Sequence, residues 1–299
     1  MNKYPKFEDI KVSTKTFTAN TNLVFDLEKI YNNIPITDYT ITQKKRGRKK
    51  KDFVPAEKQV IAFGSIITLK YEGNIKGVEL KPSKKNKSWF RNSITVVMMM
   101  DKPINFKICR SGTFQMTGCK TWSHAESCIK EIWKYIKDID ESHTFSTVDN
   151  NILVYVIPSM RNIDFDLGFN VDRGKFNKYM NQISETHCLL ETSFGYTGVS
   201  VKFPLTENRG QMGIKKLQLE NGSDVWNVQK TRYIEYLNTL PEKTKEKKLE
   251  EPKFNTFLVF HSGKVILSGV TSDFMRKTYY RFLDLVNEGY DHITEKLEK

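Results

Sequence analysis

The sequence predicts an α+β protein made of two similar halves, each an antiparallel sheet with helices packed on one face. Three observations support this prediction. One block of sequence occurs twice without a gap, segments with alternating apolar residues surround each copy, and a helical apolar pattern follows each copy. Such a sheet leaves its other face uncovered, so the use of that face decides the function. The simplest expectation for an uncovered face is a polar, solvated surface.

The repeated block is FKICRSGTFQMTG at 106–118 and FLVFHSGKVILSG at 257–269. Its matching residues lie 151 positions apart, as do Ser111 and Ser262. Further matches upstream are NLVFDL at 22–27 with NIDFDL at 162–167, and Phe63-Gly64 with Phe194-Gly195. Because the order of the blocks is the same in both halves, two repeats are expected. Their predicted spans are 1–150, with insertions at about 32–60 and 72–92, and 151–299, with an insertion at about 204–253.

Each repeat is expected to contain an opening strand, a short helix, further strands and a long amphipathic helix. Alternation predicts the opening strands at 12–20 and 152–160, and FDL leads into the short helix in each copy. The other predicted strands are 61–71, 93–100, 106–109, 115–117, 199–203, 257–260 and 265–268. Apolar residues at helical spacing predict the two closing helices at Ala125, Ile129, Ile132, Trp133 and Ile136, and at Phe274, Phe282, Leu285 and Val286.

Composition bounds the possible functions. The chain has 299 residues, 48 Lys plus Arg against 35 Asp plus Glu, a net charge of +13 and a pI of about 9.3. With 38% hydrophobic residues it can build a substantial core, and we expect no membrane span and no secretion signal. The surplus of cations points to a polyanionic partner, with DNA, RNA and anionic lipid all compatible.

No catalytic or metal-binding motif is found. The four cysteines form no CxxC pair, the five histidines are scattered, and neither a Walker motif nor GxSxG is present. We therefore expect no enzyme activity, no metal and no cofactor.

The repeated block resembles the TATA-box-binding protein family, in which each of two halves has an aromatic-x-Ser-Gly-Lys hairpin turn followed by a strand, Thr-Gly and a long helix. Phe260-His-Ser-Gly-Lys264-Val-Ile-Leu-Ser-Gly269 fits this pattern closely, and Cys109 to Gly118 fits it with substitutions. The whole sequence is most similar to the divergent factors of this family in large DNA viruses. The resemblance implies a saddle-shaped sheet that binds the DNA minor groove on its concave face and inserts aromatic wedges between base steps.

The resemblance also implies which residues contact DNA. Thr16 and Val156 would take the places of the family's base-contacting Asn residues. The concave-face candidates are Thr14, Thr16, Thr18, Asn20, Val154, Val156, Thr117 and Ser268, with Pro158 and Met160 as neighbours. The phosphate-contact candidates are Arg110, Lys264 and Lys202.

The wedge candidates are Phe260 and Tyr196 in the second half and Cys109 and Phe63 in the first. Cys109 stands where the family has Phe. Phe63 follows from the internal match, whereas an alignment on Met100 to Pro103 puts the first-half wedge near Phe90 or Asn92 instead. Burial in the core is the competing expectation for each aromatic residue.

Two segments are strongly basic. KKRGRKKK at 44–51 must be solvated; its cations are Lys44, Lys45, Arg46, Arg48, Lys49, Lys50 and Lys51. Arg46-Gly47-Arg48 resembles the centre of an AT-hook without its Pro, and a nuclear-targeting signal or nonspecific phosphate contact would equally explain the segment. Lys81 to Arg91 places Trp89 and Phe90 among cations, which suits stacking on bases. The end of the second insertion, 241–253, is expected to be a solvated helix or loop.

The leading hypothesis is a transcription initiation factor that binds and bends A·T-rich promoter DNA and presents its outer surface to a transcription-factor-IIB-like protein and an RNA polymerase. It would act inside the cell, in a nucleus or a viral factory. The second hypothesis is a saddle-shaped interaction scaffold with weak or no specific DNA binding. A third is the nucleic-acid-binding module of a repair enzyme or ribonuclease. The oligomeric state is left open.

Overall fold

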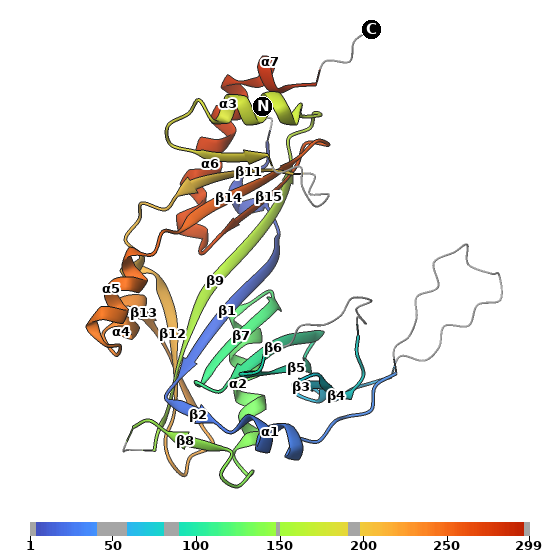
Figure 1. Ribbon diagram of the computed structural model, residues 1–299, viewed down its shortest axis with the longest axis vertical. Helices are drawn as coiled ribbons and strands as arrows, with labels where there is room; N and C mark the ends of the chain where they lie inside the picture. Colours follow the sequence, from blue (N-terminus) through green and yellow to red (C-terminus); the bar gives the residue numbers. More distant parts are fainter. Residues whose placement is uncertain (1–3, 41–58, 81–89, 148–149, 191–197, 296–299) are drawn as a thin grey trace, which may run out of the picture. The chain divides into compact units, whose positions relative to one another are not determined.

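The computed structural model describes residues 4–40, 59–80, 90–147, 150–190 and 198–295 (Figure 1). Their fold is α+β, as predicted. The helices are α1 (Leu27–Asn33), α2 (Trp122–Ile136), α3 (Arg173–Met180), α4 (Tyr233–Leu237), α5 (Glu242–Glu250), α6 (Ser272–Glu288) and α7 (Tyr290–Ile293), with short 3-10 turns at Phe7–Asp9 and Arg209–Gln211. The strands of the first half are β1 (Val12–Thr21), β2 (Leu23–Phe25), β3 (Ile66–Tyr71), β4 (Asn74–Gly77), β5 (Ser93–Met99), β6 (Pro103–Cys109), β7 (Thr113–Cys119) and β8 (His143–Phe145). Those of the second half are β9 (Ile152–Asp166), β10 (His187–Leu190), β11 (Gly198–Pro204), β12 (Gly213–Leu219), β13 (Trp226–Arg232), β14 (Phe254–Phe260) and β15 (Lys264–Gly269).

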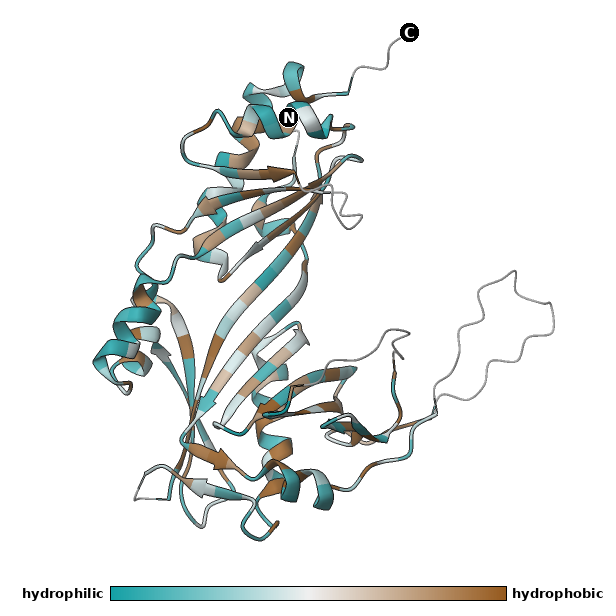
Figure 2. Cartoon of the chain, viewed as in Figure 1, coloured by the Kyte–Doolittle hydropathy of each residue, from teal (hydrophilic) through white to brown (hydrophobic). Residues whose placement is uncertain are grey.

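One large sheet runs in the order β10-β11-β14-β15-β9-β1-β7-β6-β5-β3-β4. The strands β12 and β13 pair with each other, and β12 also pairs with β9. A separate antiparallel pair is formed by β2 and β8. Hydrophobic and hydrophilic residues alternate along the strands (Figure 2).

The described chain divides into two compact units. Unit 1 comprises residues 1–16, 157–215 and 230–299, and unit 2 comprises 17–156 and 216–229. Both β1 and β9 therefore contribute residues to each unit. The units are defined by contacts in space rather than by sequence similarity. The repeat boundary near residue 150 therefore stays a prediction.

Each unit buries its own hydrophobic core between strands and helices. In unit 2, Ile30 of α1 and Ile132 of α2 lie with Phe17, Val96 and Phe106 of the strands in one cluster. In unit 1, apolar residues of α3 and α6 pack with those of β9, β11, β14 and β15. Helices thus cover one side of the sheet in each unit, as predicted. The helix α5, in contrast, has no buried residue, which fits the expected solvated end of the insertion.

The two closing hairpins have the same register, which confirms the gapless repeat. Asn105 pairs with Thr117 between β6 and β7, and Thr256 pairs with Ser268 between β14 and β15. Each hairpin is followed by a long helix with a Thr cap, because Thr121 accepts a hydrogen bond from the backbone N–H of His124 and Thr271 from that of Phe274.

The opening strands, however, correspond with a separation of 146 rather than the 140 read from the sequence. Asp26 caps α1 by accepting from the Lys29 N–H, and Asp172 caps α3 by accepting from the Lys175 N–H. The backbone hydrogen bonds give the same separation of 146. The Thr21 N–H donates to Gly112 O at 3.1 Å, and the corresponding Leu167 N–H donates to Gly263 O at 2.9 Å. The match of NLVFDL with NIDFDL is therefore wrong as a structural correspondence, and the second short helix begins at Arg173 rather than directly after residue 167.

A glycine in each hairpin turn permits the close approach behind this correspondence. Gly112 has φ +77°, and a Cβ there would lie 2.0 Å from Leu23 O; Gly263 has φ +79°, and a Cβ would lie 2.2 Å from Phe169 O. Any side chain would push the backbone of the opening segment away from the turn.

Gly112→Ala should therefore destabilise the protein much more than Gly118→Ala. Gly118 also has a positive φ, +74°, but nothing lies within 4 Å of an added Cβ. We expect a loss of about 1 kcal/mol at Gly118, from backbone strain alone, and about 3 kcal/mol at Gly112, where the clash adds to it. Urea unfolding measures both, and equal losses would contradict the role of the close approach.

Candidate nucleic-acid interface

The open face of unit 2, defined as the side of its strands away from α1 and α2, is polar. Along β1, Phe17 and Ala19 point into the core, so Thr18 and Asn20 point to the open face. The Thr113 hydroxyl donates to Asn20 Oδ1 at 3.2 Å, which places both side chains on that face. The same alternation adds Asn105, Lys107 and Cys109 of β6, and Gln115 and Thr117 of β7. On β5 the corresponding Ser93 and Val97 are buried.

The open face of unit 1 is the side of its strands away from α3 and α6. On β14 and β15 it carries Leu258, Phe260, Lys264, Ile266 and Ser268, which alternate with the core residues Phe257, Val259, Val265 and Leu267. On β9 it carries Asn162, Asp164 and Asp166, which alternate with Ile163 and Phe165. These faces are where a ligand could reach the sheet.

Val154 and Val156 do not lie on the open face, contrary to the sequence-based expectation. Both are completely buried in the core of unit 2, and Val154 lies beside Ile129, Ile132 and Ile136 of α2. The separation of 146 explains the error, because Thr16 then corresponds to Asn162, Thr18 to Asp164, and Asn20 to Asp166.

With this correspondence, Asn162 rather than Val156 takes the second of the two places where the resemblance implies a base-contacting Asn. Asn162 lies opposite Ser268 across the β9–β15 pair, and its backbone oxygen accepts a hydrogen bond from Ser13 Oγ at 3.2 Å. Its side-chain Oδ1 is buried and has no hydrogen-bond partner among the described residues. Thr14 and Thr16 on β1 are half-buried. The shared Asp-x-x-Lys at 26–29 and 172–175 was the signal in the sequence that gives the correct correspondence.

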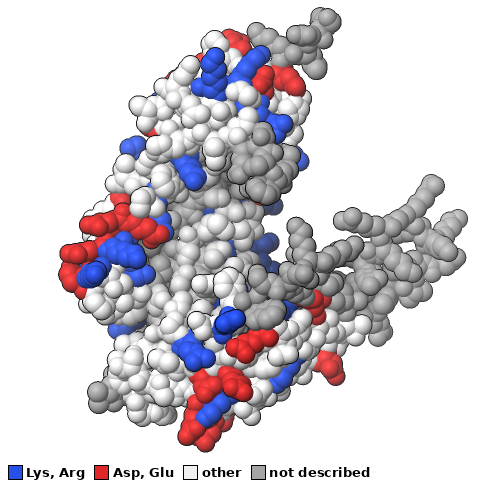
Figure 3. All heavy atoms as spheres, viewed as in Figure 1, with Lys and Arg blue, Asp and Glu red and all other residues white. Residues whose placement is uncertain are grey.

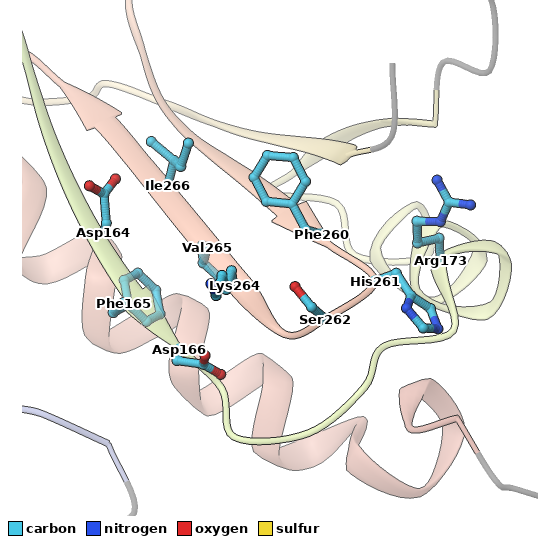
Figure 4. A pocket seen from close by; sticks show the side chains of 10 residues that line it. All are labelled: Asp164, Phe165, Asp166, Arg173, Phe260, His261, Ser262, Lys264, Val265 and Ile266. Atoms are coloured by element: carbon cyan, nitrogen blue, oxygen red, sulfur yellow. The ribbon is translucent and has the colours of Figure 1, made fainter. Parts of the chain in front are cut away.

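Phe260 borders an open pocket at the hairpin end of unit 1 (Figure 4). The Phe260 ring and the side chain of Ile266 lie on the same side of the hairpin. Asp164, Asp166 and Arg173 also line this pocket. One oxygen of Asp166 accepts a hydrogen bond from the Gly168 N–H at 2.8 Å, and Lys264 stands directly opposite Asp166 in the sheet.

The corresponding pocket of unit 2 is lined by Cys109, Phe90, Lys107, Arg91 and Arg110. Cys109 occupies the place of Phe260, since Ser93 pairs with Cys109 as Gly198 pairs with Phe260. Phe90 is 69% exposed, and Lys107 Nζ lies 3.6 Å from the centre of its ring, a cation–π contact. An exposed aromatic thus stands beside the cysteine that replaces the expected one.

Phe63 is not at this hairpin end, so its assignment as the first-half wedge is wrong. Its neighbour Gly64 donates its N–H to Met99 O at 2.7 Å, at the end of β5 away from Ser93. Gly64 also lies against Glu131 of α2, on the helix-covered side. Of the two alignments considered from the sequence, the register supports the one that points to Phe90.

The remaining candidates divide into three groups. Thr117 is exposed and Ser268 half-buried, both on open faces, and Arg110, Lys264 and Lys202 are exposed. Lys202 lies 5.8 Å from the centre of the Phe254 ring. Tyr196 and the basic residues 44–51 lie outside the described residues.

Charge separates the two open faces. The open-face residues of β1, β5, β6 and β7 in unit 2 include Lys107 and no Asp or Glu, with Arg91 and Arg110 at the hairpin end. On the neighbouring β3, Lys70 forms an ion pair with Glu79. The open face of unit 1 carries Asp164 and Asp166 beside Lys264. Elsewhere both signs lie close together, as over α5 in Figure 3, where Lys and Glu alternate along a helix with no buried side chain. A polyanion is therefore favoured on unit 2 and partly opposed on unit 1.

The described residues show no other chemical centre. They contain no group of three metal-ligating side chains and no helix long and apolar enough to cross a membrane. Burial raises the pKa of Cys119 to about 11 and that of Cys188 to about 12, so these thiols are protonated at neutral pH. Burial also raises the pKa of Cys109.

Comparison with known proteins links this architecture to two viral proteins. The chain is 26% identical over 299 residues to uncharacterized protein 335L of Invertebrate iridescent virus 6, covering 96% of this chain and 86% of that protein. It is 26% identical over 223 residues to a protein of Acanthamoeba polyphaga mimivirus named TATA-box-binding protein-like, covering 67% of this chain and 56% of that protein. No family model matches the chain.

Among solved structures, the TBP of Methanococcus jannaschii aligns with 95% of this chain and 99% of its own, with 14% identity and a TM-score of 0.46.

The fold defines a two-repeat α+β protein with one helix-covered and one open side to its sheet. The chain is similar in sequence to the mimivirus protein named TATA-box-binding protein-like, and its repeated hairpin motif fits that resemblance.

The corrected correspondence of the opening strands can be tested by exchanging residue types. Val156→Asn puts an amide into a closed apolar core and should lower the free energy of unfolding by about 3 kcal/mol. Asn162→Val, on the half-buried open face, should change it by less than about 1 kcal/mol. Denaturant unfolding measures both, and a well-tolerated Val156→Asn would contradict the corrected face.

Proposed function

We propose that the protein is a transcription initiation factor that binds double-stranded, A·T-rich promoter DNA in the minor groove and bends it. The observation that carries this proposal is the part of the unit 2 open face formed by β1, β5, β6 and β7, which is polar, carries no carboxylate and is bordered by Arg91, Lys107 and Arg110. Hydroxyl and amide groups suit the acceptors of the minor-groove floor, while the cations suit phosphates.

The aromatic residues at the hairpin ends support bending in particular. Each end carries an accessible aromatic ring, Phe260 in unit 1 and Phe90 in unit 2, next to a pocket. Apolar rings inserted between base steps unstack and kink a duplex. Asn162 adds an amide whose NH2 group can donate to the acceptors of the minor-groove floor.

The helix-covered side is the proposed surface for a transcription-factor-IIB-like protein and an RNA polymerase, and the proposed place of action is a nucleus or a viral factory. The role is one of binding rather than catalysis.

The second candidate function, an interaction scaffold with weak or no specific DNA binding, is favoured by Asp164 and Asp166. Two carboxylates on the open face of unit 1 oppose phosphates, and Cys109 replaces an aromatic residue in unit 2. A gel-shift titration on A·T-rich duplexes at two salt concentrations separates the candidates. A DNA-binding factor should give a discrete complex that weakens steeply with salt, whereas a scaffold should give none.

Phe260→Ala should reduce DNA bending more than it reduces protein stability. Removal of a half-buried ring costs about 2 kcal/mol of unfolding free energy, but it removes the whole wedge. We expect a clear loss of energy transfer between dyes at the ends of a duplex, and about tenfold weaker binding. Phe63→Ala is the matched control, because this ring is 59% exposed but lies at the other end of β5. Equal bending by both variants would exclude the wedge role.

Asp164→Asn should strengthen DNA binding. The exposed carboxylate stands on the open face near the proposed path of the phosphates, so neutralising it removes a repulsion of about 1 kcal/mol, or about fivefold in affinity, at low salt. Asp284→Asn makes the same charge change on an exposed position of α6 and should have little effect. Fluorescence anisotropy at 50 and 200 mM salt measures both, and no difference between the two variants would argue against DNA on this face.

A further inference from the structure

The hairpin of β12 and β13 is an integral part of unit 2, although it comes from the insertion in the second half of the sequence. β12 pairs with β9, and Leu217 and Leu219 are buried in the core of unit 2. Trp226 of β13 lies beside Ile132 of α2 and Val154 of β9. Lys137 at the end of α2 forms an ion pair of 3.0 Å with Asp224 near the hairpin tip. The first repeat has no counterpart, because β5 and β6 are joined by the short turn 100–102.

The alternation of a strand decides what this hairpin shows on its other side. Leu217, Leu219, Trp226 and Val228 pack on the core, so the intervening residues point to the open face of unit 2. These residues are Lys216, Gln218, Asn227 and Gln229. Asn227 and Gln229 are exposed, and Lys216 and Gln218 are half-buried.

This set of side chains matches the rest of the open face in chemistry. It contains one cation, three amides and no carboxylate, just as the face formed by β1, β6 and β7 contains hydroxyls, amides and Lys107. Amides both donate and accept hydrogen bonds, which suits sugar, phosphate and base-edge atoms. Lys216 and Lys107 would repel a partner with a basic surface and attract a polyanion, so a polyanion is the favoured partner of this face.

We propose that the hairpin widens the DNA-contacting face of unit 2, so that bound duplex is also held by Lys216, Gln218, Asn227 and Gln229. This inference rests on the proposed function. It assigns to the insertion a second contact with the duplex, outside the two repeats, and it predicts a longer protected segment than the repeats alone would give.

The test combines four substitutions, Lys216→Ala, Gln218→Ala, Asn227→Ala and Gln229→Ala, in the full chain. None of these side chains belongs to the core cluster, and a thermal melt checks that the fold is kept. On an A·T-rich duplex we expect about tenfold weaker binding, a salt slope lower by about one phosphate contact, and a footprint shortened on one flank. Lys216→Arg alone should keep the wild-type slope.

The matched control is Lys243→Ala with Lys247→Ala, two exposed residues of α5 in the same insertion. It removes more charge but should leave the footprint unchanged. If wild-type protein binds duplex and the fourfold variant has the same affinity and footprint, the inference is overturned while the proposed function stands. If wild-type protein binds no duplex at all, both are overturned.

Discussion

The contact between each hairpin turn and the chain that follows the opening strand is the constraint on which the site depends. Gly112 and Gly263 have positive φ angles, which residues with a side chain rarely adopt. Each packs directly against a backbone carbonyl of the segment that follows the opening strand. The contact sets the register between the opening strand and the hairpin. In a strand, a shift by one residue exchanges the two faces, so this register decides which side chains a ligand can meet.

The two units put different chemistry on the same framework. In unit 2 the opening strand contributes Thr18 and Asn20; in unit 1 the corresponding residues are Asp164 and Asp166. At the hairpin ends, a phenylalanine in one unit corresponds to a cysteine with a neighbouring exposed phenylalanine in the other. The two units share this backbone geometry, while their open-face charges differ. The open face of unit 2 therefore favours a polyanion more than the open face of unit 1 does.

The insertions also differ in what they add. The segment with α5 has no buried side chain and both signs of charge, whereas β12 and β13 place four apolar side chains in a core and four polar ones on the open face. An amphipathic hairpin that pairs with an existing strand costs little to order, because the sheet already presents the backbone groups that it needs. Such an insertion changes the area of the face without changing the fold.

The sequence by itself determined the fold class, the gapless hairpin repeat and both closing helices, because these depend on local alternation, turn glycines and helical spacing around residues such as Gly112 and Ile132. It also singled out Phe260 as a wedge; the structure puts Phe260 on the open face, and the wedge role stays a prediction. It misplaced Val154, Val156 and Phe63, because short apolar matches recur by chance and the faces of a strand depend on its partner. Only the tertiary structure decided that Asn162, Asp164 and Phe90 stand at the open face, since hydrogen bonds between distant segments fix that register.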